Sequence, residues 1–203
     1  TITVTGMTTS KAFYPAYVQA GGRSTVTLTL YNTSAVPMTN ISVTDTMPGT
    51  AADGVRVAAV PNAITTCGGT LTAAPGSNVV TLTGGTILAG SIATPSLCTI
   101  TFDVVGTDGT PGSASTQTNT LPAADVDAFI GSTGVATNPV ANSQAILNIQ
   151  DLTMGVVKGF NPVLVYGGAY STMSVQLINP NLNAPLTGIA FTEDMTLLGT
   201  GLR

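Results

Sequence analysis

The feature that most constrains this chain is a segment that occurs twice. Residues 11–32 read KAFYPAYVQAGGRSTVTLTLYN, and residues 158–179 read KGFNPVLVYGGAYSTMSVQLIN, so the two copies align without a gap. The second copy follows the first at a displacement of 147 residues (158 − 11). The identities are Lys11, Phe13, Pro15, Val18, Gly21, Ser24, Thr25, Leu30 and Asn32, which return as Lys158, Phe160, Pro162, Val165, Gly168, Ser171, Thr172, Leu177 and Asn179. Self-similarity at a fixed period predicts a repeat architecture.

The similarity continues beyond the 22-residue segment and defines the expected domains. With one inserted residue, the pattern from Pro37 to Met47 matches the pattern from Pro185 to Met195. We therefore expect residues 1–8 to end a preceding repeat, 9–150 to form one complete repeat, and 151–203 to supply the first strands of a second. Two or three strands bury too little apolar surface to stand alone. The missing strands would come from further chain or from a neighbouring molecule by strand addition.

Apolar and polar residues alternate along most of the chain. This two-residue period is typical of a half-buried β-strand. Val26, Leu28 and Leu30 alternate with threonines, and Ile100 and Phe102 do the same. Turn signals such as Pro-Gly, Gly-Gly and Asp-Gly punctuate these runs. Short strands at such spacing predict an all-β fold, an immunoglobulin-like Greek-key β-sandwich. Residues 121–141 fit either a short strand or a helical turn, and the choice stays open.

The composition excludes several classes of function. Charged residues make up 7% of the chain, against roughly 25% in an ordinary soluble domain. Five scattered Lys and Arg residues cannot form the basic stripe that nucleic acid requires. No apolar run approaches the roughly 18 residues of a membrane span, so no membrane insertion is expected in this segment. The chain has no histidine, the usual general base and metal ligand, and we expect no enzyme, no cofactor and no metal site.

Motifs along residues 9–149 carry a family resemblance. The ordered set is K-x-F-x-P, G-G-x-S-T-V-T-L-T-L-x-N, T-D-T-M-P-G, T-C-G-G-T, C-T-I-T-F-D-V and T-N-T-L. This set resembles a repeated immunoglobulin-like domain of large bacterial and archaeal cell-surface proteins, and it restarts near residue 156. The resemblance implies stalks, adhesins, surface layers or fibres built from tandem β-domains. The second copy has Glu193-Asp194 in place of Asp45-Thr46, so the D-T-x-P turn is lost there.

Cys67 and Cys98 are the only cysteines. Cys98 shares its parity with Ile100 and Phe102, so its sulfur is expected to face the core. A disulfide between them would stabilise the fold by about 3–4 kcal/mol in the chain-entropy model. The alternatives are two buried free thiols or half of a metal site, for which the chain lacks further ligands. In a secreted domain the disulfide is favoured.

Lys11, Asp45 and Asn119 form the second candidate site. Each shares its strand parity with apolar neighbours, so all three side chains are expected to point inward. Burial favours a neutral, nucleophilic lysine and a protonated carboxyl. Such a set allows the amine to attack the carboxamide and release ammonia, which would leave an isopeptide bond between the first and last strands. Bonds of this kind are known in immunoglobulin-like surface domains, which the family resembles in this placement.

Two alternatives to that crosslink stay open. In one, Lys11 and Asp45 form an ion pair while Asn119 caps a turn. In the other, Lys11 lies at the surface with only its stem packed. In the second copy, Lys158 and Glu193 preserve the roles of the lysine and the acid.

Two further patterns are weaker. Asn32 and Asn40 each begin an N-glycosylation sequon, and Asn32 is expected at a strand end. Asp125–Asp127 and Asp103–Asp108 have too few closely spaced oxygens for a calcium loop, so exposed strand and turn acids are the favoured interpretation.

Together these features predict an extracellular structural repeat protein of a surface fibre, filament, stalk or layer. Its expected partners are copies of itself, with glycans as a further candidate. The alternative is an adhesin repeat that binds a glycan or a host protein through loops at one end of the sandwich. Tyr14, Tyr17, Tyr166 and Tyr170 lie near the repeated K-x-F-x-P segment, a placement that suits a domain junction better than an open binding face.

Overall fold

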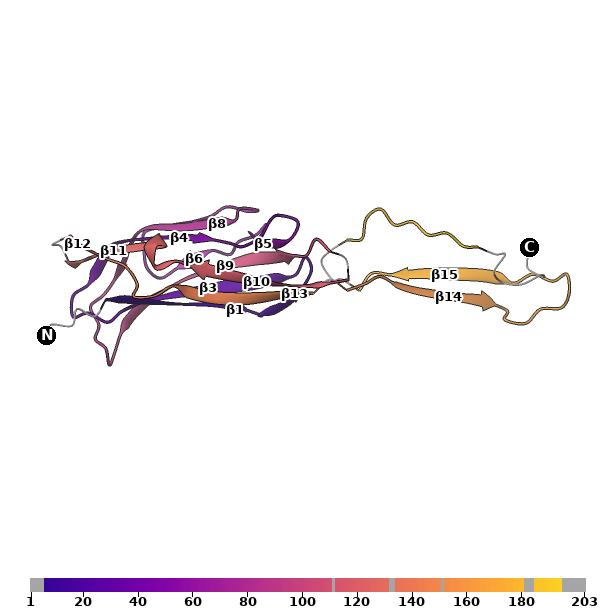
Figure 1. The fold of residues 1–203 in the computed structure, drawn as a ribbon, viewed down its shortest axis with the longest axis horizontal. Coiled ribbons are helices and arrows are strands. Elements are labelled where there is room, and N and C mark those ends of the chain that lie inside the picture. Colours follow the sequence, from indigo (N-terminus) through magenta and orange to yellow (C-terminus); the bar gives the residue numbers. More distant parts are fainter. Residues whose placement is uncertain (1–5, 111, 132–133, 151, 181–184, 195–203) are drawn as a thin grey trace.

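β-Strands make up most of the protein. The computed structural model describes residues 6–110, 112–131, 134–150, 152–180 and 185–194. The strands up to residue 150 form a sandwich, and a separate hairpin then extends away from it along the long axis (Figure 1). The predicted all-β immunoglobulin-like sandwich with a partial second repeat is confirmed. In the described part of the chain, no helix is long and apolar enough to cross a bilayer. The expected end of a preceding repeat, residues 1–8, falls largely on residues 1–5, outside the described ranges.

The first layer of the sandwich is an antiparallel sheet in the order β1-β3-β9-β5, with β6 also paired to β9. Its strands are β1 (Met7–Tyr14), β3 (Arg23–Asn32), β5 (Gly54–Val57), β6 (Ile64–Thr65) and β9 (Ser96–Thr107). The threonine-rich alternation of β3 places Val26, Leu28 and Leu30 inward, as predicted. In β9 the same period buries Cys98, Ile100 and Phe102. β-Branched residues on the outer face suit a pleated, half-buried strand.

Two groups of strands face this sheet. One has the order β12-β11-β4-β8-β7 and the other has the order β10-β13-β2. Their strands are β2 (Tyr17–Gln19), β4 (Met38–Thr46), β7 (Thr70–Ala73), β8 (Val79–Ile87), β10 (Ala114–Leu121), β11 (Val126–Ile130), β12 (Val135–Thr137) and β13 (Ser143–Gln150). β2 continues the path of β1 and pairs in parallel with β13, with Val18 opposite Ile149. The first and last strands of the repeat are thereby tied together.

The segment left open by the sequence contains both kinds of element. A 3-10 turn, η1 (Ala123–Asp125), leads directly into β11, which pairs with β4 and β12. Val126 and Ala128 point into the core. Residues 121–141 therefore hold a short helical turn followed by two short strands.

The second copy of the repeat forms a hairpin of β14 (Gly155–Asn161) and β15 (Thr172–Ile178). Lys158 pairs with Val175 as Lys11 pairs with Leu28, so each partner is displaced by 147. Residues 185–194, which correspond to β4, form no strand. Their copy in the first repeat pairs with β8 and β11, for which the second repeat has no equivalent among the described residues.

Candidate functional site

Three predicted side chains meet inside the sandwich. Lys11 lies in β1, Asp45 in β4 and Asn119 in β10, so the site joins the two layers. The Lys11 Nζ atom lies 2.5 Å from both carboxylate oxygens of Asp45. Asn119 donates a hydrogen bond of 3.5 Å from Nδ2 to Asp45 Oδ2. The carboxyl group is therefore in contact with both the amine and the carboxamide.

Strand parity explains why these polar groups point inward. Lys11 lies opposite Leu28 of β3, and Asp45 lies opposite Val80 of β8. Alternate residues of a strand face the same side of the sheet. Lys11 therefore shares a face with Phe13, and Asn119 shares one with Leu121. The prediction that the three residues face the core is confirmed.

The site is isolated from solvent. The side chains of Lys11 and Asp45 are 0% and 1% exposed, and Asn119 is 0% exposed. Removing two charges from water costs several kcal/mol per ion, which the attraction between them offsets only in part. An inward lysine and aspartate therefore add less to the stability of the folded state than the apolar residues at most other inward positions would.

Burial shifts both titrations towards the uncharged forms. Burial lowers the pKa of the Lys11 amine from its ordinary 10.5, although the charge and hydrogen bonds of Asp45 oppose this shift. Burial likewise raises the pKa of the Asp45 carboxyl from its ordinary 3.8, opposed by Lys11 and by the hydrogen bond from Asn119. A neutral amine is a nucleophile, and a protonated carboxyl is a general acid.

The carboxamide of Asn119 is the least satisfied of the three groups. Its Nδ2 atom also lies 3.2 Å from the Met47 sulfur, which is a weak acceptor. Its Oδ1 atom is buried without a hydrogen-bond partner in the structure. Asn119 lies within β10, so it does not cap a turn, and Lys11 does not lie at the surface. The first alternative is therefore confirmed in its Lys11–Asp45 ion pair and wrong in its turn cap, and the second alternative, a surface lysine, is wrong.

One expectation about the connection needs correction. A bond between Lys11 and Asn119 would join β1 to β10, not the first strand to the last. The chain continues from β10 through η1, β11 and β12 to β13, which pairs back onto β10. The sequence pattern of residues 121–141 did not predict β11 and β12. Asn119 was therefore wrongly placed on the last strand.

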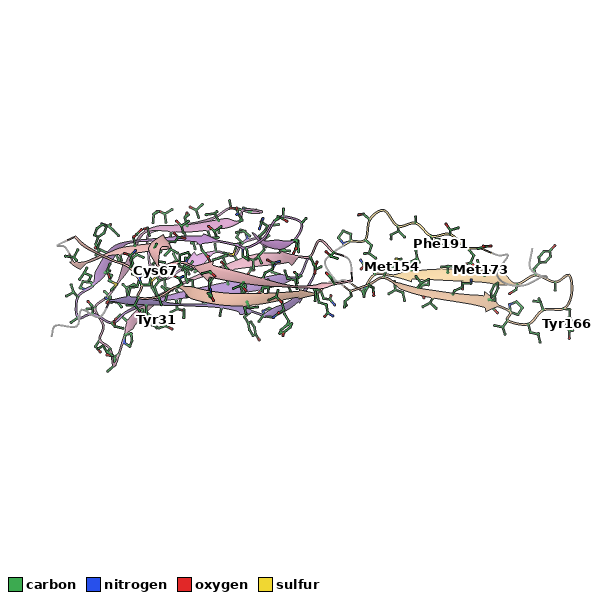
Figure 2. All side chains as sticks on the ribbon, in the orientation of Figure 1. Tyr31, Cys67, Met154, Tyr166, Met173 and Phe191 are labelled. Atoms are coloured by element: carbon green, nitrogen blue, oxygen red, sulfur yellow. A yellow bond between two sulfur atoms is a disulfide. The ribbon has the colours of Figure 1, made fainter. Side chains whose placement is uncertain are left out.

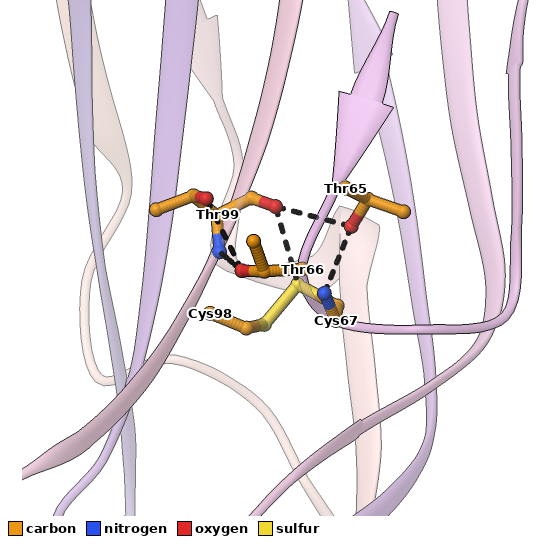
Figure 3. Close-up of a disulfide and its surroundings, with 5 residues drawn as sticks. All are labelled: Thr65, Thr66, Cys67, Cys98 and Thr99. Atoms are coloured by element: carbon orange, nitrogen blue, oxygen red, sulfur yellow. Dashed lines mark hydrogen bonds between the residues drawn. A yellow bond between two sulfur atoms is a disulfide. The ribbon is translucent and has the colours of Figure 1, made fainter.

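Cys67 and Cys98 form the predicted disulfide, with Cα atoms 4.9 Å apart. Figure 3 shows the bridge next to the hydrogen bonds that link Thr65 and Thr66 to Cys67 and Thr99. Thr65 Oγ1 accepts from the Cys67 amide, and Thr66 Oγ1 accepts from the Thr99 amide. The bridge thus fixes the loop after β6 against β9, and the free-thiol and metal alternatives are wrong.

The two sequons differ in access. Asn32 is 0% exposed; its Nδ2 donates to the carbonyls of Val36 and Leu88, and its Oδ1 accepts from the Ser34 amide. Attachment of a glycan at Asn32 is therefore incompatible with the folded domain. Asn40 lies exposed at a bulge of β4 with φ of 49°, and its glycosylation stays a prediction.

The acidic stretches that were weighed as calcium ligands have protein partners. Asp103 accepts hydrogen bonds from Thr25, at 2.7 Å, and from Asn62, at 2.7 Å. Asp127 accepts from Asn138 at 2.8 Å. No group of three or more metal-ligating side chains gathers among the residues that the structure describes. Asp103, expected to be exposed, is instead buried and fixes the loop that contains Asn62.

Sequence reasoning missed Met47 as part of the site. It is buried and its sulfur contacts Asn119. Its recurrence as Met195 at the corresponding position of the second copy is the signal that would have identified it.

The second copy retains the amine and the acid. Lys158 Nζ lies 2.6 Å from Glu193 Oε1, which reproduces the pairing of Lys11 with Asp45. The two side chains are 35% and 23% exposed, because no strand beyond β14 and β15 packs over them in the described part of the second repeat. The expectation that Lys158 and Glu193 form an equivalent pair agrees with this geometry.

A family model described as a domain of unknown function, DUF7933, matches residues 8–145. This range contains Lys11, Asp45, Asn119 and both cysteines. No match was found among curated proteins.

Several solved structures resemble this chain at low sequence identity. The major pilin subunit BcpA of Bacillus cereus is 12% identical with a TM-score of 0.44, over 85% of this chain and 54% of the pilin. The major pilin SpaD of Corynebacterium diphtheriae is 12% identical with a TM-score of 0.44, over 75% and 36%. A non-cellulosomal cohesin of the archaeon Archaeoglobus fulgidus is 15% identical with a TM-score of 0.38, over 70% and 91%. This chain spans about half the length of the Bacillus pilin.

Proposed function

This chain belongs to the DUF7933 family, and on that premise we propose that it is an extracellular structural module of a surface fibre, stalk or layer. The module is stabilised by its disulfide and by an isopeptide bond between Lys11 and Asn119. The observation that supports this proposal is the burial of an amine, a carboxyl and a carboxamide in mutual contact. A core built mostly from apolar residues gains little stability from such a set, but the set is suited to forming a covalent bond.

The reaction follows from the contacts of Asp45. The neutral Nζ of Lys11 attacks Cγ of Asn119 and forms the new C–N bond. The bond from Cγ to Nδ2 breaks, and Nδ2 leaves as ammonia. Asp45 contacts both the attacking Nζ and the leaving Nδ2, so its carboxyl can accept the proton from one and donate a proton to the other. The products are a secondary amide and ammonia, with no oxidant or reductant required.

The position of the bond gives it a mechanical role. Lys11 and Asn119 are 108 residues apart (119 − 11), and most of the sandwich lies between them. Tension that enters through β1 would pass across the new bond into β10 and then through β13 to β14. The intervening strands, including the disulfide, would carry no load. Resistance to unfolding under tension is the property that a fibre or stalk module needs.

The composition supports an extracellular assembly. With 7% charged residues, the surface is rich in hydroxyl groups and has few charges to keep separate molecules apart. A disulfide persists in oxidising compartments outside the cytosol. Copies of the chain are the expected partners, glycans remain a candidate partner through Asn40, and no catalysis is assigned.

Intact mass spectrometry of the purified, reduced and denatured chain tests this proposal. The expected mass is that of the sequence less one ammonia. The variants Asn119→Ala and Lys11→Arg should both return the full mass of their sequences, because each lacks one reacting group. A wild-type mass equal to that of the unmodified sequence would refute the crosslink.

A binding module is the second candidate, and the tip of the hairpin favours it. Tyr166 and Tyr170 are 92% and 94% exposed there, and Figure 2 shows Tyr166 at the end of the molecule farthest from the sandwich. Negative-stain microscopy separates the two functions. Filaments or sheets favour the structural module, whereas single rods with affinity for a glycan or host protein favour an adhesin.

A further inference from the structure

We propose that Lys158 and Glu193 form the open half of a second crosslinking site, whose occupant is an asparagine-bearing β-strand of the β10 type. The proposal rests on the crosslink proposed for Lys11 and Asn119. It adds a site in the second repeat, a class of ligand and a covalent outcome.

The backbone of the second repeat already has the geometry of the first. Every pair in β14–β15 has a counterpart in β1–β3 displaced by 147 residues. Ser171 donates to the Pro162 carbonyl at 2.6 Å, as Ser24 donates to the Pro15 carbonyl at 2.7 Å. The reactive lysine is therefore held at the same place on the same kind of hairpin.

Lys158 lies on the face of the hairpin whose counterpart in the first repeat is buried in the core. Phe160, Met173, Val175 and Leu177 share it and correspond to Phe13, Val26, Leu28 and Leu30. The first-copy residues are buried, whereas the second-copy residues are only partly covered. Figure 2 shows Phe191 on the segment that runs beside this hairpin. The second copy thus presents side chains suited to the same interior.

An apolar pocket lies at the end of the hairpin that contains Phe160 and Ser171. It has a volume of about 140 Å³ and is lined by Phe160, Pro162, Val163, Val165 and Ser171. In the first repeat the residue equivalent to Val165 is Val18, which lies opposite Ile149 of β13. The Val165 side of the pocket therefore adjoins the position that β13 occupies in the first repeat.

The first repeat also identifies what covers the lysine. Asn119 of β10 reaches the Lys11–Asp45 pair, and β13 pairs with β10 as a hairpin. Among residues 155–180 and 185–194, which the structure describes, no strand supplies either position. The occupant is therefore a strand pair of the β10–β13 type with an inward asparagine, for which residues 113–150 of the first repeat are the template.

The chemistry is the same as in the first repeat. Nζ of Lys158 attacks the asparagine Cγ, the C–N bond to the amide nitrogen breaks, and ammonia leaves. Glu193 lies 2.6 Å from Nζ and carries the proton from the attacking nitrogen to the leaving one. The incoming strands would also exclude water from the pair, which is now 35% and 23% exposed.

The test mixes the full chain with a synthetic peptide of residues 113–150, which contains β10 and β13. The expected product is a covalent adduct equal in mass to chain plus peptide less one ammonia, with the linkage mapped to Lys158 after trypsin digestion. The chain variant Lys158→Arg keeps a cation beside Glu193 but cannot form the amide, and it should give no adduct. The peptide variant Asn119→Ala should also give none.

The outcomes separate this proposal from the one on which it rests. The unmixed chain reports the first crosslink through its own loss of ammonia. If that loss occurs and the mixture yields no adduct at Lys158, the second site alone is refuted. Adducts at Lys158 that map to a peptide residue other than Asn119 would also overturn the proposal, because the incoming strand would then not take the position of β10.

Discussion

Lys11 Nζ lies within 2.5 Å of both carboxylate oxygens of Asp45, in a core where neither side chain is more than 1% exposed. The amide nitrogen of Asn119 completes the contact at 3.5 Å. An ion pair at this depth is weak evidence for stability, since apolar residues of the same volume usually stabilise a core at least as well. The proposed bond-forming role would account for the presence of all three groups.

The variant Asn119→Ala should lose the stability that a covalent link provides. Closing a loop of about 100 residues stabilises a fold by roughly 4.7 kcal/mol in the chain-entropy model. Guanidinium denaturation monitored by circular dichroism should therefore show a free energy of unfolding lower by about 4 kcal/mol or more. Thr118→Ala, at an exposed position of the same strand, is the matched control and should change it by less than about 0.5 kcal/mol. Equal losses in both variants would argue against a crosslink.

Single-molecule pulling should reveal the load path. With the bond in place, only the residues outside positions 11–119 can extend, so unfolding the sandwich should release roughly 100 Å of chain. In Asn119→Ala the released length should rise to roughly 400 Å, with the disulfide still shielding its own loop. A wild-type length equal to that of the variant would show that tension does not bypass the sandwich.

The variant Lys11→Met should acquire a distinctive pH dependence. Burial raises the folded-state pKa of Asp45 above 3.8, and removing Lys11 eliminates the charge that opposes this shift. Between 3.8 and the raised pKa, the folded state binds more protons than the unfolded state, so stability falls as pH rises. The free energy of unfolding should be measured by urea denaturation at about pH 3.5 and about pH 7, one value near each end of that window. We expect the larger free energy of unfolding at the lower pH.

The double variant Lys11→Met/Asp45→Asn is the control for this pH dependence, because it lacks the titrating carboxyl. It should show a smaller difference between the two pH values. A Lys11→Met chain whose stability instead falls on acidification by more than the double variant would contradict a buried carboxyl with a raised pKa.

Removal of the disulfide should have a moderate effect on stability. Cys67 and Cys98 are 31 residues apart, and the double variant to alanine should lose about 3–4 kcal/mol in thermal or guanidinium unfolding. Its chain should still lack one ammonia, because the two links are independent. Failure of the crosslink to form in this variant would show that β9 must be fixed before Lys11 can react.

Much of this fold could be predicted from the alternation of apolar and polar residues along each strand. The alternation of Val26, Leu28 and Leu30 identified both the strand and its inward face, and parity placed Lys11, Asp45 and Asn119 in the core. Parity works because successive side chains of a strand point to opposite faces. It requires no knowledge of which strand lies next to which.

Features that depend on distant partners could not be predicted in this way. Asn32 is buried and donates hydrogen bonds to the carbonyls of Val36 and Leu88. Leu88 is 56 residues away in the sequence. Asp103 is held by Asn62, which adopts a left-handed backbone conformation in a loop. The strands within residues 121–141 are short and defined by pairing, so the position of Asn119 in the strand order could not be deduced from local pattern.

The linkage itself is the most direct test of the central claim. Trypsin cannot cleave after Lys11 when its amine is acylated, so digestion of the reduced chain should join the peptide of residues 1–23 to the peptide of residues 57–158. Tandem mass spectrometry should place the bond between Lys11 and Asn119, with one ammonia absent. Recovery of separate peptides, with complete cleavage after Lys11, would contradict the account.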